Sequence, residues 1–161
     1  MELKDLQKKI EDTKEYKQLK EKQDLILTHI LRIQEKDKDT GWEFGYFDKD
    51  SNKITVFEQE PFKVREPDEM LSEDNIVEEL KLDEVKTSFL QADNKVQDFA
   101  KEKGVLSIVK KIFILQKKEG LIWNITYLTN EFKLLNIKID AITGEIVHSD
   151  VVSVFDLGLK T

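Results

Sequence analysis

The stretch DKDSN, residues 48–52, places two carboxylates and an amide at alternate positions, the spacing with which a calcium-binding EF-hand loop begins. Such a loop also needs a glycine at its sixth position, for the sharp turn, and a bidentate glutamate at its twelfth. This sequence has Lys53 and Gln59 there, and strand patterns rather than helix patterns flank the stretch. We therefore interpret DKDSN as a hairpin turn whose Asp and Asn side chains accept backbone hydrogen bonds.

The other residues able to do chemistry are dispersed along the chain. The two histidines, His29 and His148, lie in different halves, whereas a metal site or a catalytic base needs partners that converge in space. No serine stands in a G-x-S-x-G context, and the six glycines form no phosphate-binding loop. The sequence therefore predicts no catalytic residue, no cofactor and no metal site, and it favours a protein that is not an enzyme. A small enzyme that uses surface carboxylates and a purely structural or interaction domain are the alternatives.

Aromatic residues alternate along two strand patterns. Trp42, Phe44 and Tyr46 share one face of the first, and Trp123 and Tyr127 share one face of the second. Such a face can be the core layer that packs against a helix, or a concave surface that binds a peptide or ligand. Matching positions in both halves favour the core, and the five residues are kept as the candidate binding surface.

Composition narrows the classes of function. The chain has 161 residues and no cysteine, which excludes disulfides, thiolate nucleophiles and cysteine-based metal sites. Residues 58–84 hold eleven acidic and three basic side chains, so this segment accounts for the net charge of −7. The only arginines are Arg32 and Arg65, and nucleic-acid binding, which needs a basic face, is not expected.

The sequence has no membrane-targeting pattern. No stretch approaches the ~20 consecutive apolar residues of a membrane span, and the N-terminus alternates charges where a signal peptide would be apolar. From that absence we expect a cytoplasmic protein, and an extracytoplasmic one if an anchor has been trimmed from the chain.

Apolar periodicity predicts helices followed by strands. Apolar residues recur at helical spacing over 3–22 and 83–103. Strand patterns cover 41–47, 53–57, 107–115, 121–128, 132–139 and 145–155. The apolar stretch 25–33 fits a helix or a strand, and its alignment with 107–115, given below, favours a strand. The segment between these groups contains both prolines, and it could add a helical turn or two starting from Ser72 as a cap.

The two halves of the chain resemble one another at a constant offset of 81 or 82 residues. KEK at 20–22 matches 101–103, ILRIQEK at 30–36 aligns with IFILQKK at 112–118, and Trp42 and Tyr46 align with Trp123 and Tyr127. Such self-similarity indicates one supersecondary unit used twice, although drift between two strand-rich halves is an alternative.

The predicted fold class is therefore α+β, with two repeats that each pack an N-terminal helix on an antiparallel β-meander. The first unit, 1–60, has a helix and three strands. An acidic connector, 61–82, joins it to the second unit, 83–161, which has a helix and four strands.

The stretch LIWNITYLTNEFKLLNIKIDAITGEIV, residues 121–147, resembles a PepSY domain. The signature is an aromatic strand, a hairpin, a strand that ends in Ile/Val-Asp, and then Thr-Gly before the last strand. The matching residues are Trp123, Tyr127, Ile139, Asp140, Thr143, Gly144 and Glu145. Within it, Asp140, Thr143 and Gly144 form a structural turn, in which Asp140 caps the turn and Gly144 takes a positive φ.

The resemblance covers about residues 83–155, and the layout of the whole chain resembles the two-domain, cystatin-like PepSY proteins of Gram-positive bacteria. Those proteins are usually anchored outside the cell. The first half departs from the pattern, with EQEPFKV at 58–64 in place of the Asp-x-x-Thr-Gly signature. PepSY domains occur in protease propeptides, are proposed to modulate proteases, and have no known catalytic residues.

The resemblance therefore implies a non-enzymatic protein- or peptide-binding module with a regulatory role. The expected partner is a protein or peptide, with no nucleic acid and no membrane span, and the oligomeric state stays open.

Overall fold

The computed structural model of the protein describes residues 2–58, 63–69 and 77–153. Its helices are α1 (Leu3–Glu11), α2 (Lys14–Lys22) and α3 (Phe89–Glu102), with one short 3-10 turn, η1 (Leu82–Glu84). Its strands are β1 (Leu25–Glu35), β2 (Lys38–Asp39), β3 (Glu43–Asp48), β4 (Lys53–Glu58), β5 (Lys63–Glu69), β6 (Ile108–Lys117), β7 (Leu121–Thr129), β8 (Lys133–Asp140) and β9 (Ile146–Ser153).

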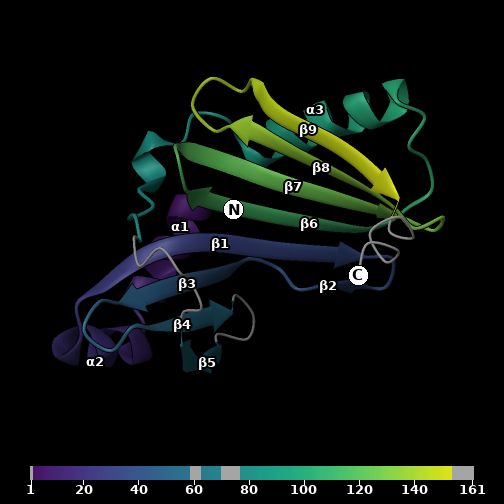
Figure 1. The fold of residues 1–161 in the computed structure, drawn as a ribbon. Helices are drawn as coiled ribbons and strands as arrows, with labels where there is room; N and C mark the ends of the chain where they lie inside the picture. The colour runs from purple at the N-terminus through teal and green to yellow at the C-terminus, as the bar shows by residue number, and fades with distance from the viewer. Residues whose placement is uncertain (1, 59–62, 70–76, 154–161) are drawn as a thin grey trace.

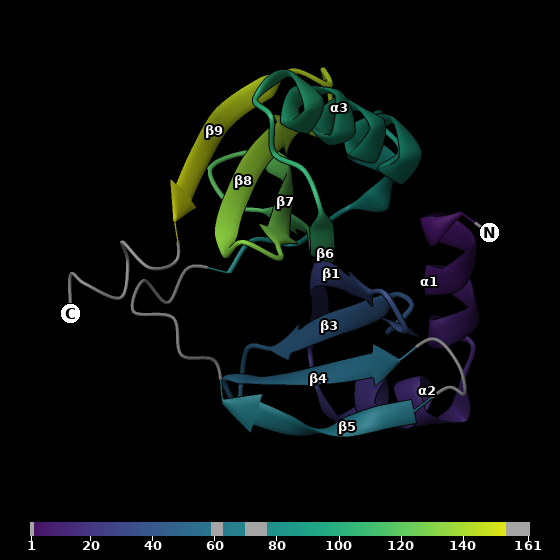
Figure 2. The same cartoon turned by 90° about the vertical axis from the view of Figure 1, so that its right-hand side faces the viewer.

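The strands form one continuous antiparallel sheet in the order β5-β4-β3-β1-β6-β7-β8-β9, with the short β2 paired to β1 (Figure 1). Figure 2 shows that the three helices lie on the same side of this twisted sheet, with α1 and α2 over the N-terminal strands and α3 over the C-terminal strands. The class is α+β, because the helices are segregated to one face of an antiparallel sheet.

The predicted division into two repeats, each a helix on its own meander, is wrong. The described residues form one sheet of eight strands in sequence across it, with β2 added beside β1, and three helices; strands β1 and β6 pair at its centre from His29↔Gln116 to Glu35↔Lys110. Two separate meanders would each leave an apolar strand with unpaired backbone N–H and C=O groups at an edge. Pairing β1 with β6 removes both edges, so the sheet is continuous.

The predicted helix over 3–22 is two helices. Thr13 has an extended backbone, with φ −71° and ψ 152°, and its hydroxyl accepts a hydrogen bond from the Tyr16 N–H at 3.2 Å. The same hydroxyl donates to the Ile10 carbonyl at 2.6 Å. Thr13 thus ends the hydrogen bonding of α1 and caps the start of α2, the competition with helix continuation that threonine side chains offer.

The second helix begins later than the predicted position 83. Ser88 accepts a hydrogen bond from the Gln91 N–H at 3.1 Å, and the Gln91 side chain accepts one from the Ser88 N–H at 2.8 Å. This reciprocal capping box starts α3 at Phe89. Leu82 and Val85, whose spacing fits the helix period, lie before the cap, in η1 and the loop that follows it.

Strand β5 lies within the segment 61–82 that was predicted as a connector, and it pairs with β4. The helical turn predicted to start at Ser72 falls outside the described residues, and residues 77–80 are not helical. This last stretch returns to the sheet, where the Leu80 N–H donates to the Leu27 carbonyl at 2.7 Å. The chain thereby forms a wall beside β1.

The hydrophobic core fills the space between the sheet and its helices. Leu6 and Ile10 of α1 and Ala92 and Val96 of α3 are buried against it. Within the described residues, none of the helices is long and apolar enough to cross a membrane.

Candidate functional site

All five aromatic residues of the candidate binding surface are buried, with at most 6% of any side chain exposed. They lie between the sheet and the helices and do not form an exposed aromatic face. The Trp42 and Trp123 rings lie 6.0 Å apart, and both also line a cavity near the start of α3. Tyr46 lines a different cavity, beneath α1 and α2.

The turn at 140–145 has a defined hydrogen-bond pattern. The Asp140 carboxylate accepts from the N–H groups of Ile142 and Thr143 at 2.8 and 3.0 Å. Gly144 has φ 80°, where a side chain is strained, and the Thr143 hydroxyl accepts from the Glu145 N–H at 3.2 Å. These groups shape the β8–β9 connection, so their role is structural.

The DKDSN stretch is the turn between β3 and β4. The Asp48 carboxylate accepts hydrogen bonds from the Asp50 N–H at 3.1 Å and from the Ser51 hydroxyl at 2.6 Å. His29 and His148 lie on β1 and β9, which are separated by three other strands. In the part of the chain that the structure describes, no group of three histidine or acidic residues could hold a metal ion.

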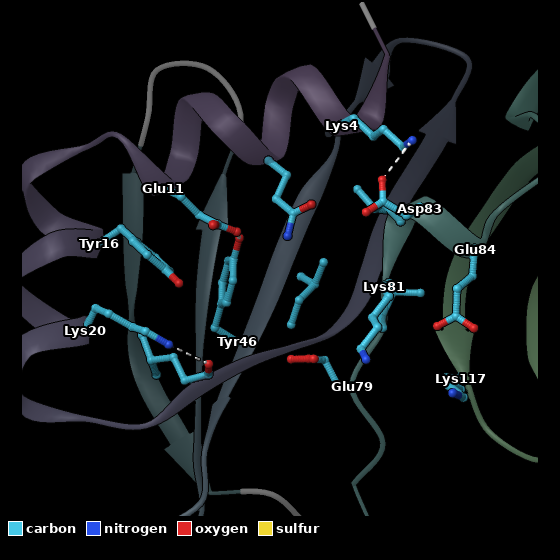
Figure 3. A pocket seen from close by; sticks show the side chains of 15 residues that line it. Lys4, Glu11, Tyr16, Lys20, Tyr46, Glu79, Lys81, Asp83, Glu84 and Lys117 are labelled. Carbon is cyan, nitrogen blue, oxygen red and sulfur yellow. Dashed lines mark hydrogen bonds and ion pairs between the residues drawn. The ribbon is translucent and has the colours of Figure 1, made fainter.

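The cavity beneath α1 and α2 has a volume of about 720 Å³ (Figure 3). Its walls come from both helices, from β1 and β3, from residues 79–84 and from Lys117 at the end of β6. The break at Thr13 lets α2 turn away from α1, and the return of residues 77–80 to β1 forms the opposite wall. At the rim, Lys4 of α1 and Asp83 of η1 form an ion pair of 2.9 Å.

Tyr46 forms the floor of this cavity. Its hydroxyl donates to the Glu11 carboxylate at 3.1 Å, and its ring lies 5.1 Å from the Tyr16 ring and 5.5 Å from the Phe57 ring, both edge to face. Burial and the nearby Glu11 charge raise the pKa of Tyr46 well above its ordinary value. The hydroxyl therefore stays protonated and can serve only as a hydrogen-bonding group at neutral pH.

Tyr16 points into the cavity from α2, as Figure 3 shows. Only 8% of the residue is exposed, yet its hydroxyl has no hydrogen-bond partner among the described residues. Burial, and then the charges of Glu11 and Glu79, raise the pKa of Tyr16 to about 12. Since no buried side-chain N or O atom of the described residues lacks a hydrogen-bond partner, the Tyr16 hydroxyl must be accessible from the cavity, where a ligand group can bind it.

The charges that line the cavity are divided between acids and lysines. Lys4 pairs with Asp83, and the Lys20 ammonium donates to the Leu25 carbonyl at 3.3 Å. Within the described ranges, none of the lining lysines forms an ion pair with Glu11 or Glu79. Among the described residues, the two carboxylates nearest the tyrosines therefore have no cationic partner.

A second cavity, of about 850 Å³, lies between the first turns of α1 and α3. Arg32, which lines this cavity, already has protein partners. Its guanidinium lies 5.3 Å from the centre of the Trp42 ring and donates to the Asp39 carboxylate at 3.0 and 2.7 Å. These bonds lower the pKa of Asp39 to about 2. The capping box also pairs the N–H groups of Ser88 and Gln91 at the start of α3, so we consider the first cavity the stronger candidate.

Sequence reasoning missed Glu11 and Glu79, and it placed Tyr16 only on an apolar helix stripe. The cap signal of Thr13 could have predicted the break between the helices. No local signal brings Glu79 to Tyr16, because the two residues are brought together by the return of residues 77–80 to β1.

No family model and no curated protein matches the sequence. A crystal structure of a candidate lipoprotein from Clostridium difficile 630 resembles the fold, with a TM-score of 0.55 and 15% sequence identity. The match covers 83% of this chain and 87% of that chain. At this identity the similarity concerns the fold alone.

Proposed function

We propose that this chain is a non-enzymatic binding module that recognises a protein or peptide partner through the cavity beneath α1 and α2. The observation that carries the proposal is the Tyr16 hydroxyl, which is directed into the cavity without a protein partner. The volume, about 720 Å³, lies within the range of roughly 300–1,000 Å³ typical of ligand sites.

The chemistry of the cavity suits recognition better than catalysis. The pKa values of Tyr16 and Tyr46 are both raised, so neither phenol can act as a base near neutral pH. Both can donate or accept hydrogen bonds, and four leucines lie among lining residues that are mostly polar or charged. A lining of this kind suits a ligand that carries charged or hydrogen-bonding groups.

A regulatory role of the PepSY-like type is part of the proposal. It is supported by the resemblance of residues 121–147 to that family and by the α+β architecture. On this view the module binds a segment of a protease or of another protein and modulates that partner. Fold by itself does not establish such a role, so a binding experiment must test it.

A random peptide library selected on the immobilised protein tests the proposal. We expect enriched peptides to bind the wild type and Glu15→Gln, an exposed residue of α2, equally well. Tyr16→Phe should bind them about three- to tenfold more weakly, the effect of one lost hydrogen bond. Failure to enrich any peptide, or equal binding by Tyr16→Phe, would contradict the proposal.

A further inference from the structure

The C-terminal half of the sheet contains a tyrosine, a carboxylate and an ammonium group in contact. The Tyr127 hydroxyl of β7 donates to the Asp93 carboxylate of α3. The Lys111 ammonium of β6 lies 3.6 Å from the same carboxylate and 4.8 Å from the centre of the Tyr127 ring. The ammonium is therefore held by a charge and by the face of an aromatic ring.

The N-terminal half has the same tyrosine and carboxylate without the ammonium. Tyr46 of β3 donates to Glu11 of α1, as Tyr127 of β7 donates to Asp93 of α3. Lys111 is the residue paired with Tyr127 across β6 and β7. The residue paired with Tyr46 across β1 and β3 is Leu27, an uncharged and buried side chain.

The surroundings of the Tyr46–Glu11 pair open onto the cavity. Leu27, Tyr46 and Glu11 all line it, and Glu79 adds a second carboxylate from the opposite wall. Burial and, after it, both carboxylates raise the pKa of the Tyr16 hydroxyl. The potential next to Tyr16 is thus negative, although four lysines line the cavity together with four acidic residues.

Other charged groups of the cavity do not remove this field. Lys4 pairs with Asp83, and Lys20 donates to a backbone carbonyl. Lys81 and Lys117 also line the cavity, but neither is within ion-pair distance of Glu11 or Glu79 in the described part of the chain. A bound anion would meet Glu11 at the floor and Glu79 on the opposite wall, whereas a cation could pair with these carboxylates.

We propose that the cavity binds a primary ammonium group, the side chain of a lysine in the partner peptide. Glu11 and Glu79 would be its counter-ions, the Tyr16 hydroxyl would accept a hydrogen bond, and the Tyr46 ring would lie against the ammonium as Tyr127 lies against Lys111. This inference deepens the proposed function and rests on it, because the lysine would belong to the partner peptide proposed above.

The experiment titrates the intact protein with three probes followed by amide NMR shifts: Nα-acetyl-lysine amide, Nα-acetyl-norleucine amide and Nα-acetyl-glutamate amide. The norleucine probe removes the charge from a chain of similar length, and the glutamate probe reverses it. We expect the lysine probe to shift residues around Tyr16 and to bind at least about tenfold more tightly than the others. Equal binding of the norleucine or glutamate probe would overturn the inference.

Two variants and one control locate the site. Glu11→Gln keeps an acceptor for the Tyr46 hydroxyl but removes the charge, and it should weaken the lysine probe roughly fivefold or more. Leu27→Lys adds a resident ammonium at the position equivalent to Lys111 and should abolish binding. Glu15→Gln should bind as the wild type does. If Leu27→Lys does not fold, the inference is tested by Glu11→Gln alone. Unchanged binding of the lysine probe to Glu11→Gln would contradict the inference.

The two proposals can fail separately. If library peptides bind the cavity with no preference for lysine over norleucine, the binding module stands and the ammonium site is wrong. If the lysine probe binds at Tyr16 but no peptide is enriched, the ammonium site stands and the peptide-binding module is wrong.

Discussion

Tyr46 and Tyr127 make the same hydrogen bond in two different surroundings. Tyr127 donates to Asp93, a carboxylate only 8% exposed, which also accepts from the Gln97 amide at 2.9 Å and lies near Lys111. Tyr46 donates to Glu11 at the floor of an open cavity. The Tyr127–Asp93 pair is buried and has Lys111 as a cationic neighbour, whereas the Tyr46–Glu11 pair is accessible to a ligand from the cavity.

The difference arises from the helices above the two tyrosines. The helix α3 runs unbroken for 14 residues over β7 and β8. The helices α1 and α2 have nine residues each and are separated by the Thr13 cap. The lesson is that one capping threonine within an amphipathic stretch can create a cavity where a continuous helix would close the core.

The largest expected effect concerns the two tryptophans. Trp123 is fully buried, and its indole N–H donates to the Thr87 carbonyl at 2.9 Å. Trp123→Ala should lower the free energy of unfolding by about 3–5 kcal/mol, and Trp42→Ala, at the margin of the second cavity, by about 3 kcal/mol. Urea denaturation measures both, and wild-type tryptophan emission should be blue-shifted. Red-shifted emission together with a stable Trp42→Ala would instead indicate an exposed ring.

Alkaline pH should remove the stability associated with all three tyrosines. Their folded pKa values lie above the ordinary value of 10.0, with Tyr16 at about 12 and Tyr46 and Tyr127 higher. The folded state therefore keeps protons that the unfolded chain releases, so stability is full below pH 10 and falls as pH rises through 12. Denaturation midpoints across this range should decline, and Tyr16→Phe should decline less between pH 10 and 12. An unchanged midpoint across that range would contradict the predicted pKa shifts.

Removing each tyrosine hydroxyl compares the buried Tyr127–Asp93 pair with the Tyr46–Glu11 pair at the cavity. Tyr127→Phe leaves the buried Asp93 with fewer hydrogen bonds and should cost about 2 kcal/mol. Tyr46→Phe should cost about 1 kcal/mol, because Glu11 can be hydrated from the cavity. Chemical denaturation of the two variants tests the order, and a larger loss for Tyr46→Phe would mean that the cavity is closed to water.

Removing the helix caps should have effects close to that of Tyr46→Phe. Ser88→Ala removes one member of a reciprocal capping box and should cost about 1–2 kcal/mol. Thr13→Ala removes one cap and should cost about 1 kcal/mol, or less if α1 and α2 then join into one helix. Helix content by circular dichroism distinguishes these outcomes, and binding of the lysine probe to Thr13→Ala shows whether the cavity depends on the break.

Much of the fold could be predicted from the sequence. All seven long strands that were predicted occur, with ends that differ by a few residues; six were predicted from their own residue patterns, and 25–33 was predicted from its alignment with 107–115. The strand β5 was missed because Pro67 lies within it and its surroundings are acidic. The candidate site was not predictable in the same way, since Tyr16 and Glu79 are 63 positions apart and no pattern relates them.

The sequence by itself determined which residues alternate between two faces of a strand, where the turns lie, and that cysteine chemistry is absent. These properties depend on side chains within a few residues of one another. Only the tertiary structure decided that β1 and β6 pair into one sheet and that residues 77–80 return to β1 beside Tyr16. The physical reason is that periodicity reports which face of a strand is buried, whereas the pairing of strand edges uses backbone groups that every residue has.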